Sequence, residues 1–74
     1  MRTEKLIAVE IPNRRYVVRV QEGPRLGTIF SSGSGWCFQF DGTDQESMSW
    51  AEPERALGEM QSVAERLGVL RTAA

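Results

Sequence analysis

Histidine is absent from this chain, and cysteine occurs once. Without histidine, the most common general base, the usual Ser–His and Cys–His catalytic pairs and the most common zinc ligand are all missing. A single cysteine excludes an internal disulfide and a zinc site built of thiolates. The carboxylates fall in expected turns and on the expected solvent face of a helix, where nothing adapts them to acid–base catalysis. We therefore expect a protein that is not an enzyme and that uses no cofactor and no metal ion.

Long apolar runs are also absent. No stretch approaches the roughly 20 apolar residues of a transmembrane helix, and no apolar segment follows Arg2 and Lys5 as it would in a signal peptide. Cys37 is expected to be a small buried residue of a strand, which fits a reducing compartment. The 74 residues are 41% hydrophobic and 26% charged, typical of a small folded domain. We expect a single domain over 1–74 in a cytoplasmic protein that does not contact membranes.

The stretch over 35–40 is expected to form the centre of the core. Its aromatic residues Trp36, Phe38 and Phe40 alternate with Cys37 and Gln39, which is the period of a strand with one buried face. A large aromatic side chain removes roughly 150–250 Å² from water when it is buried. This strand therefore dominates the apolar surface that the domain has to cover.

Alternating apolar residues predict further strands over 5–11, 14–21 and 25–31, with a short final strand over 45–50. In the first strand Ile7, Val9 and Ile11 share one side, and Ala8 and Glu10 share the other. The connections are short and rich in Gly, Pro, Asn and Asp, which predicts antiparallel pairing because a parallel crossover needs a dozen or more residues.

Two details sharpen this strand prediction. Gly27 lies inside the third strand and indicates a bulge or a close neighbour, because it has no side chain to pack. In the short final strand, Met48 and Trp50 are the candidates for the inner face.

The C-terminal part predicts a helix that begins near Pro53 and stops at Gly68. Its apolar stripe consists of Ala56, Leu57, Met60, Val63, Ala64 and Leu67. Val69 or Leu70 is expected to fold back on the last turn, and residues 71–74 are expected to fray. The predicted fold class is α+β: an antiparallel sheet of four to five strands packed by one C-terminal helix.

Charge is unevenly spread along the chain. Residues 1–25 carry a net charge of +3 and residues 26–74 a net charge of −4. The outer face of the first hairpin is expected to show Arg15 and Arg19 on either side of Val17, with Ala8 on the neighbouring strand. Arginine is enriched in protein interfaces and also contacts nucleic-acid phosphates. The candidate binding residues are Lys5, Arg14, Arg15, Val17, Arg19 and Arg25.

Two plainer interpretations stay open beside this one. The acidic outer face of the helix, with Glu59 and Glu65, is a second candidate surface, and both surfaces could simply be solvated.

Part of the chain resembles a known class of DNA-binding domain. The motifs are Gly27-Thr28-Ile29, Gly35-Trp36-Cys37-Phe38, Ser49-Trp50 and Glu54-Arg55-Ala56. They are similar to the three-stranded, helix-ended arm-type DNA-binding domains of phage and mobile-element integrases. Those domains are basic across the sheet, whereas residues 26–50 here contain no lysine or arginine. In size and element order the chain also resembles small phage-encoded proteins that bind host RNA polymerase.

These observations favour a non-enzymatic small regulatory protein that binds a host protein complex. The resemblance implies a phage-type transcription modulator, with host RNA polymerase as the protein partner. The alternative is a nucleic-acid-binding module of a mobile element that uses the same arginines on phosphates. A purely structural or self-associating role stays open as well.

Overall fold

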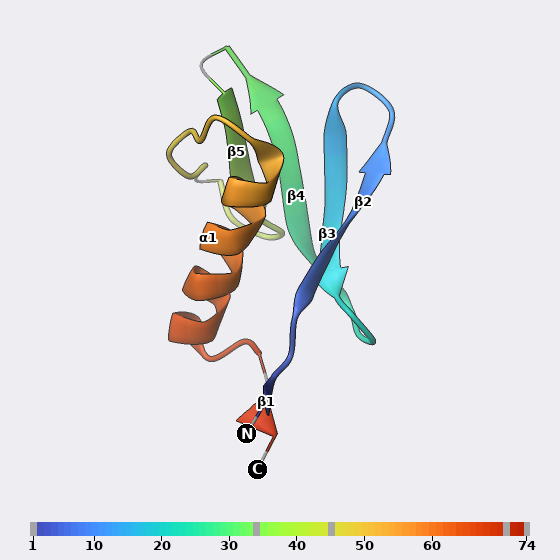
Figure 1. Ribbon diagram of the computed structural model, residues 1–74, viewed down its shortest axis with the longest axis vertical. Coiled ribbons are helices and arrows are strands. Elements are labelled where there is room, and N and C mark those ends of the chain that lie inside the picture. Colours follow the sequence, from blue (N-terminus) through green and yellow to red (C-terminus); the bar gives the residue numbers. More distant parts are fainter. Residues whose placement is uncertain (1, 34, 45, 71, 74) are drawn as a thin grey trace.

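The computed structural model describes residues 2–33, 35–44, 46–70 and 72–73. Its main element is an antiparallel four-stranded sheet in the order β2-β3-β4-β5. The strands are β2 (Leu6–Ile11), β3 (Arg15–Val20), β4 (Arg25–Ser32) and β5 (Gly35–Phe40). Helix α1 (Pro53–Leu67) packs on one face of this sheet, mainly over β5, and also contacts β4 and β2 (Figure 1). The α+β class, the antiparallel sheet and the C-terminal helix are therefore confirmed.

A second, two-stranded sheet joins the chain ends. Strand β1 (Arg2–Thr3) pairs antiparallel with β6 (Thr72–Ala73), and both termini lie beside it at one end of the molecule (Figure 1). Fraying was predicted for residues 71–74. Residues 72–73 are paired instead, and residues 71 and 74 lie outside the described residues.

Helix α1 begins and ends where the sequence predicts. Pro53 occupies the first turn, and Gly68 ends the helix in a left-handed conformation with a φ of 74°. The N–H of Gly68 donates to the carbonyl of Glu65 at 3.2 Å, which satisfies a carbonyl that the helix leaves open. Leu70 then folds back and is buried, whereas Leu67 is 65% exposed and does not belong to the buried stripe.

The aromatic strand lies in the core as expected. Phe38 is buried, and the Trp50 ring stacks on it with centroids 5.5 Å apart and planes tilted by 10°. Val18, Ile29 and Met60 are the largest side chains that are completely buried. Sheet and helix therefore bury their apolar faces against each other, which is the main stabilising contact of the fold.

The inner face of β2 differs from the prediction. Ala8 pairs with Val18, and it turns toward α1 together with the buried Leu6. Val9 pairs with Val17 on the opposite face. The placement of Ala8 on the outer face was wrong, because Leu6 on its own side of the strand fills the core and fixes the register.

Gly27 lies at a bulge with close neighbours, as predicted. The register between β3 and β4 shifts beside it, and a Cβ atom there would clash with the carbonyl oxygen of Gln39 and approach Met60 Cε to 2.8 Å. The bulge lets Leu26 pack against the core, while Phe30 further along β4 faces away from it.

The segment after β5 returns along the edge of β5, but only partly as a strand. Trp50 forms an isolated antiparallel bridge with Trp36, and Trp50 packs inward as predicted. Met48 is 77% exposed, so its assignment to the inner face was wrong. Gln45, the first residue of the predicted strand, lies outside the described residues.

Candidate functional site on the uncovered sheet face

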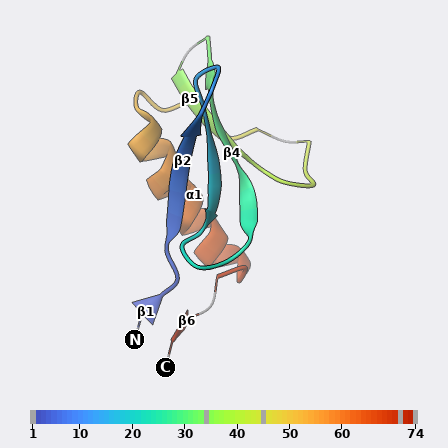
Figure 2. The same ribbon diagram turned by 90° about the vertical axis from the view of Figure 1, so that its right-hand side faces the viewer.

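The sheet face opposite α1 has no helix over it (Figure 2). We call this surface the open face. Strand pairing places the following side chains on it: Ile7, Val9 and Ile11 from β2, Arg15, Val17 and Arg19 from β3, and Thr28 and Phe30 from β4. They form rows across the sheet, because residues directly opposite in an antiparallel pair share a face.

The outward side of β2 is entirely aliphatic. Val9 is 46% exposed, and Ile7 and Ile11 are half-buried by their neighbours. Val9 lies beside Val17, so the aliphatic surface continues onto β3. An antiparallel sheet with one solvated face normally alternates apolar residues inside with polar residues outside. This strand instead presents apolar side chains on both faces.

Two arginines border the aliphatic surface at its two ends. Arg15 pairs with Ile11 and Arg19 pairs with Ile7. The Nη1 of Arg19 donates to the carbonyl of Gln21 at 3.0 Å, so this guanidinium is held at the end of β3. Among the described residues, neither arginine forms an ion pair with a carboxylate. The open face therefore combines an apolar centre with uncompensated positive charge.

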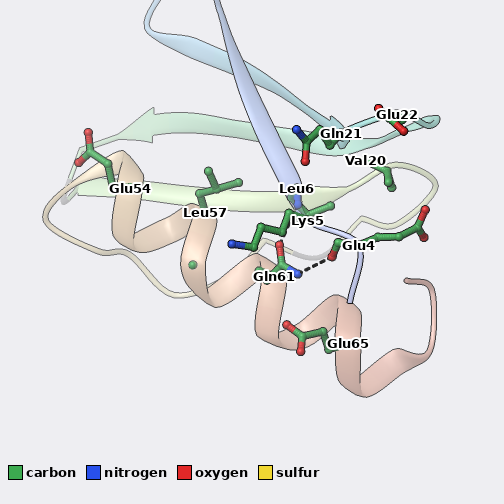
Figure 3. Close-up of a pocket in the computed structure, with 11 residues that line it drawn as sticks. Glu4, Lys5, Leu6, Val20, Gln21, Glu22, Glu54, Leu57, Gln61 and Glu65 are labelled. Atoms are coloured by element: carbon green, nitrogen blue, oxygen red, sulfur yellow. Dashed lines mark hydrogen bonds between the residues drawn. The ribbon is translucent and has the colours of Figure 1, made fainter. Parts of the chain in front are cut away.

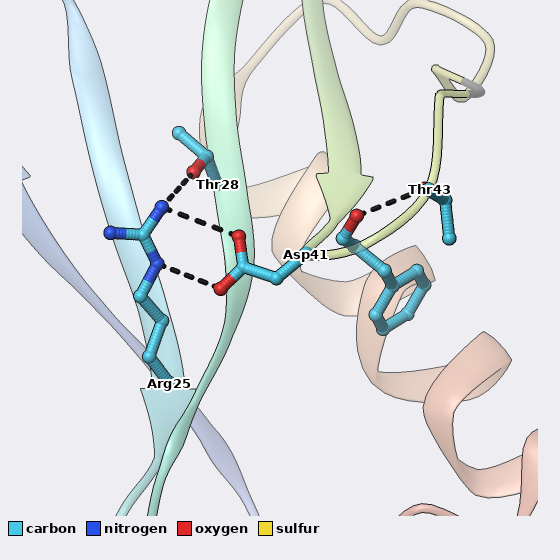
Figure 4. Close-up of polar contacts among 5 residues, drawn as sticks. Arg25, Thr28, Asp41 and Thr43 are labelled. Carbon is cyan, nitrogen blue, oxygen red and sulfur yellow. Dashed lines mark hydrogen bonds and ion pairs between the residues drawn. The ribbon is translucent and has the colours of Figure 1, made fainter.

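Arg25 is the first residue of β4, and its positive charge is paired with the carboxylate of Asp41. Its Nε donates to Asp41 Oδ2 at 2.9 Å and its Nη2 to Asp41 Oδ1 at 3.3 Å (Figure 4). The same Nη2 donates to Thr28 Oγ1 at 3.2 Å. Both side chains of the ion pair are about half exposed, at 52% and 49%. Such a pair contributes little to stability, but it leaves less of the charge of Arg25 for a partner.

The remaining predicted site residues, Arg14 and Lys5, do not lie on the open face. Arg14 sits in the turn between β2 and β3, with its guanidinium carbon 5.5 Å from the centroid of the Trp36 ring, which packs on the core side. Lys5 lines a groove between β2 and α1 (Figure 3). Of the six predicted residues, the structure brings together Arg15, Val17 and Arg19, with Arg25 nearby.

The groove beside Lys5 has a volume of about 1,100 Å³. Gln61 spans its floor: Oε1 accepts from the N–H of Leu6 and Nε2 donates to the carbonyl of Glu4, each at 2.8 Å (Figure 3). Carboxylates of Glu54 and Glu65 also line it. The described part of the chain holds no group of three or more side chains placed to bind a metal ion.

Five of these open-face residues were not among the predicted site residues. These are Ile7, Val9, Ile11, Thr28 and Phe30. The signal for β2 was Leu6, since an alternation that begins at this residue puts Leu6 and Ala8 inward. For Phe30 the signal was the glycine three residues earlier, because the bulge at Gly27 shifts the faces of β4.

No helix in the described residues is both long and apolar enough to cross a bilayer. Comparison of the chain with family models, with curated proteins and with solved structures gives no match.

Proposed function

We propose that this chain is a non-enzymatic protein-binding module and that the open face is its binding surface. The observation that carries the proposal is the outward side of β2, where the exposed Val9 and the half-buried Ile7 and Ile11 form an aliphatic surface next to Val17. Contiguous apolar surface of this kind marks interaction sites in small soluble domains. Folding does not account for it, because the core is built on the other face of the same strands.

The arginines define the kind of partner. Arg15 and Arg19 bracket the aliphatic surface and have no carboxylate of the described chain beside them. A protein surface with an apolar centre and an acidic rim complements this arrangement, since arginine is enriched in interfaces and opposite potentials steer association. A phage-type regulator bound to a host RNA polymerase is the specific case that the sequence resemblance supports.

A matched pair of charge reversals tests the surface. Arg15→Glu with Arg19→Glu reverses the charge of the open face, while Arg55→Glu with Arg66→Glu makes the same charge change on exposed positions of α1. Binding of each double variant to purified host RNA polymerase is measured by calorimetry or surface plasmon resonance. We expect the first to weaken binding by tenfold or more, about 1.4 kcal/mol, and the second to leave it nearly unchanged. Equal effects of the two double variants would place binding elsewhere.

A further variant separates protein binding from nucleic-acid binding. Val17→Ser removes aliphatic surface between the arginines and keeps their charge. A protein interface loses affinity with this change, whereas phosphate contacts do not depend on the valine. Binding of labelled DNA or RNA that survives Val17→Ser and falls steeply with salt would replace the proposal with the nucleic-acid alternative.

A further inference from the structure

Strand β2 forms an edge of the sheet, and part of its backbone points away from the molecule. In the ladder with β3, the N–H of Gln21 donates to the carbonyl of Lys5 at 2.9 Å. Hydrogen-bonded pairs alternate along an antiparallel ladder, so Leu6, Ala8 and Glu10 direct their N–H and C=O groups outward. The bond from the Leu6 N–H to Gln61 on the helix agrees with this direction.

The open part of this edge is short and has defined ends. The N–H of Leu6 is already bonded to Gln61, and Pro12 beyond the other end has no N–H to offer. Between them, Ala8 and Glu10 present two N–H and two C=O groups, and no group in the described part of the chain bonds to them. Unpaired edges of this kind are templates for another strand.

We propose that β2 pairs with β2 of a second copy of this chain, antiparallel about a twofold axis that passes through Val9. In this register Ala8 lies opposite Glu10 of the second copy, and the reverse holds by symmetry. The two pairs form four backbone hydrogen bonds and use the outward N–H and C=O groups of Ala8 and Glu10 of both edges. Pairing ends at Leu6 and Pro12, where each chain lacks a free N–H.

The side chains also fit this register. Val9, which is 46% exposed, meets Val9 of the second copy, and Ile7 meets Ile11. Six aliphatic side chains, three from each strand, then lie together on the open face. Glu10 lies opposite Ala8, a small residue, so the two carboxylates are not directly opposed.

Neighbouring registers fit less well. If Glu10 lay opposite Glu10, like charges would face each other across the axis, which destabilises a strand pair. If Ala8 lay opposite Ala8, Leu6 would enter the ladder although its N–H is already bonded to Gln61. The register about Val9 avoids both conflicts.

Such a dimer extends the sheet to eight strands and places two open faces side by side. The aliphatic surfaces merge at the axis, and Arg15 and Arg19 of each copy lie outside them. The dimer uses the aliphatic side chains of β2 that also belong to the proposed binding surface. It is tested on the chain alone, whereas the proposed function is tested by binding of the partner, so the two can fail separately.

Sedimentation velocity over a range from micromolar to near-millimolar chain concentration tests the pairing. We expect the wild-type chain to shift from monomer to dimer across this range. Val9→Lys places two ammonium groups at the axis and should raise the dimer dissociation constant by about tenfold or more. Val69→Lys is the matched control, because Val69 is 49% exposed and lies after α1, away from the edge. Circular dichroism checks that both variants fold.

The backbone contribution is tested at Glu10. Glu10→Pro removes an outward N–H at a strand edge, where proline is tolerated, and should abolish the dimer. Glu10→Ala keeps the N–H and should leave dimerisation intact.

The register is tested with Val9→Cys, which brings two thiols to the axis. Directly opposite residues that share no backbone hydrogen bonds have closely spaced Cβ atoms, so mild oxidation should cross-link this variant. Val69→Cys should not cross-link. The proposal fails if the wild-type chain remains monomeric throughout, if the two lysine variants dissociate equally, or if Glu10→Pro still dimerises. A monomer that accepts an extended peptide along β2 would also overturn it.

Discussion

The two edges of the four-stranded sheet differ in how many of their backbone groups are hydrogen-bonded by the rest of the described chain. At the β5 edge, the segment over 46–50 returns and bonds to the strand it has just left. The partners are Trp50 for both backbone groups of Trp36, Ser47 for both groups of Phe38, and Thr43 for the carbonyl of Phe40. At the β2 edge, Gln61 is the only side chain of the described residues that bonds to the backbone of the strand.

The contrast separates an edge that contributes to the core from an edge whose backbone groups stay largely uncovered by the described residues. Covering the β5 edge brings Trp50 onto Phe38, so closing that edge also enlarges the core. The β2 edge carries no lysine, no proline and no bulge between Leu6 and Ile11, which are the usual protections of an exposed strand. Changes at the first edge should therefore affect unfolding, and changes at the second should affect contacts between molecules.

Removing the Trp50 ring should have the largest effect. Trp50→Ala deletes the stacking contact with Phe38 and leaves a gap over the core, for an expected loss of about 3 kcal/mol in the free energy of unfolding. A domain this small has a low free energy of unfolding, so a loss of this size should lower the melting temperature clearly. Thermal melting followed by circular dichroism measures it. Trp50→Phe keeps an aromatic ring there and should cost clearly less. Equal losses for the two variants would mean that the ring contact contributes nothing.

Substitution of Gly35 tests how closely the segment over 46–50 approaches β5. Its φ is 148°, and a Cβ atom would clash with the carbonyl oxygen of Trp50. Gly35→Ala should therefore destabilise the fold by about 2 kcal/mol, measured by urea unfolding. Gly33→Ala, where nothing lies within 4 Å of the added Cβ atom, is the control and should change stability by less than about 0.5 kcal/mol. Unchanged stability of Gly35→Ala would show that the segment over 46–50 can move away from β5 without cost.

Ser47 reports on the hydrogen bonds of the same edge. Its Oγ accepts from the N–H of Phe38 at 2.8 Å. Ser47→Ala leaves that N–H without this partner, and we expect a loss of about 1 kcal/mol in the free energy of unfolding. Amide hydrogen exchange should show faster exchange at Phe38 and unchanged exchange at Ile29 in the middle of the sheet. Unchanged exchange at Phe38 would mean that Ser47 does not protect it.

Most of the fold could be predicted because local patterns determine it. The aromatic period over 35–40, the stop at Gly68 and the bulge at Gly27 each follow from residues adjacent in sequence. The inner face of β2 could not be read in the same way. Its strand has aliphatic residues on both sides, so alternation defines two faces without saying which one the helix covers.

The candidate site was predicted only for β3, where the faces differ clearly in character. Arg15 and Arg19 share a side with a single valine, so burial of the opposite side was the only sensible choice. Arg14 and Lys5 lie outside regular strands, and their directions depend on turn geometry and on the path into β2. The compensation of Arg25 by Asp41 depends on the β4–β5 pairing, a tertiary feature that no local pattern records.

Within the described residues, Gln61 is the helix side chain that bonds to the β2 edge, and its removal should separate stability from association. Gln61→Ala removes the hydrogen bonds that this side chain forms with the N–H of Leu6 and the carbonyl of Glu4. Both backbone groups can reach water, and alanine is a better helix former, so the expected loss is only about 0.5 kcal/mol. The freed N–H of Leu6 lengthens the open edge, so sedimentation should show stronger self-association than in the wild-type chain. Ser62→Ala, the neighbouring exposed helix position, should change neither quantity. If Gln61→Ala lost stability without any gain in association, the difference between the two edges would concern folding alone.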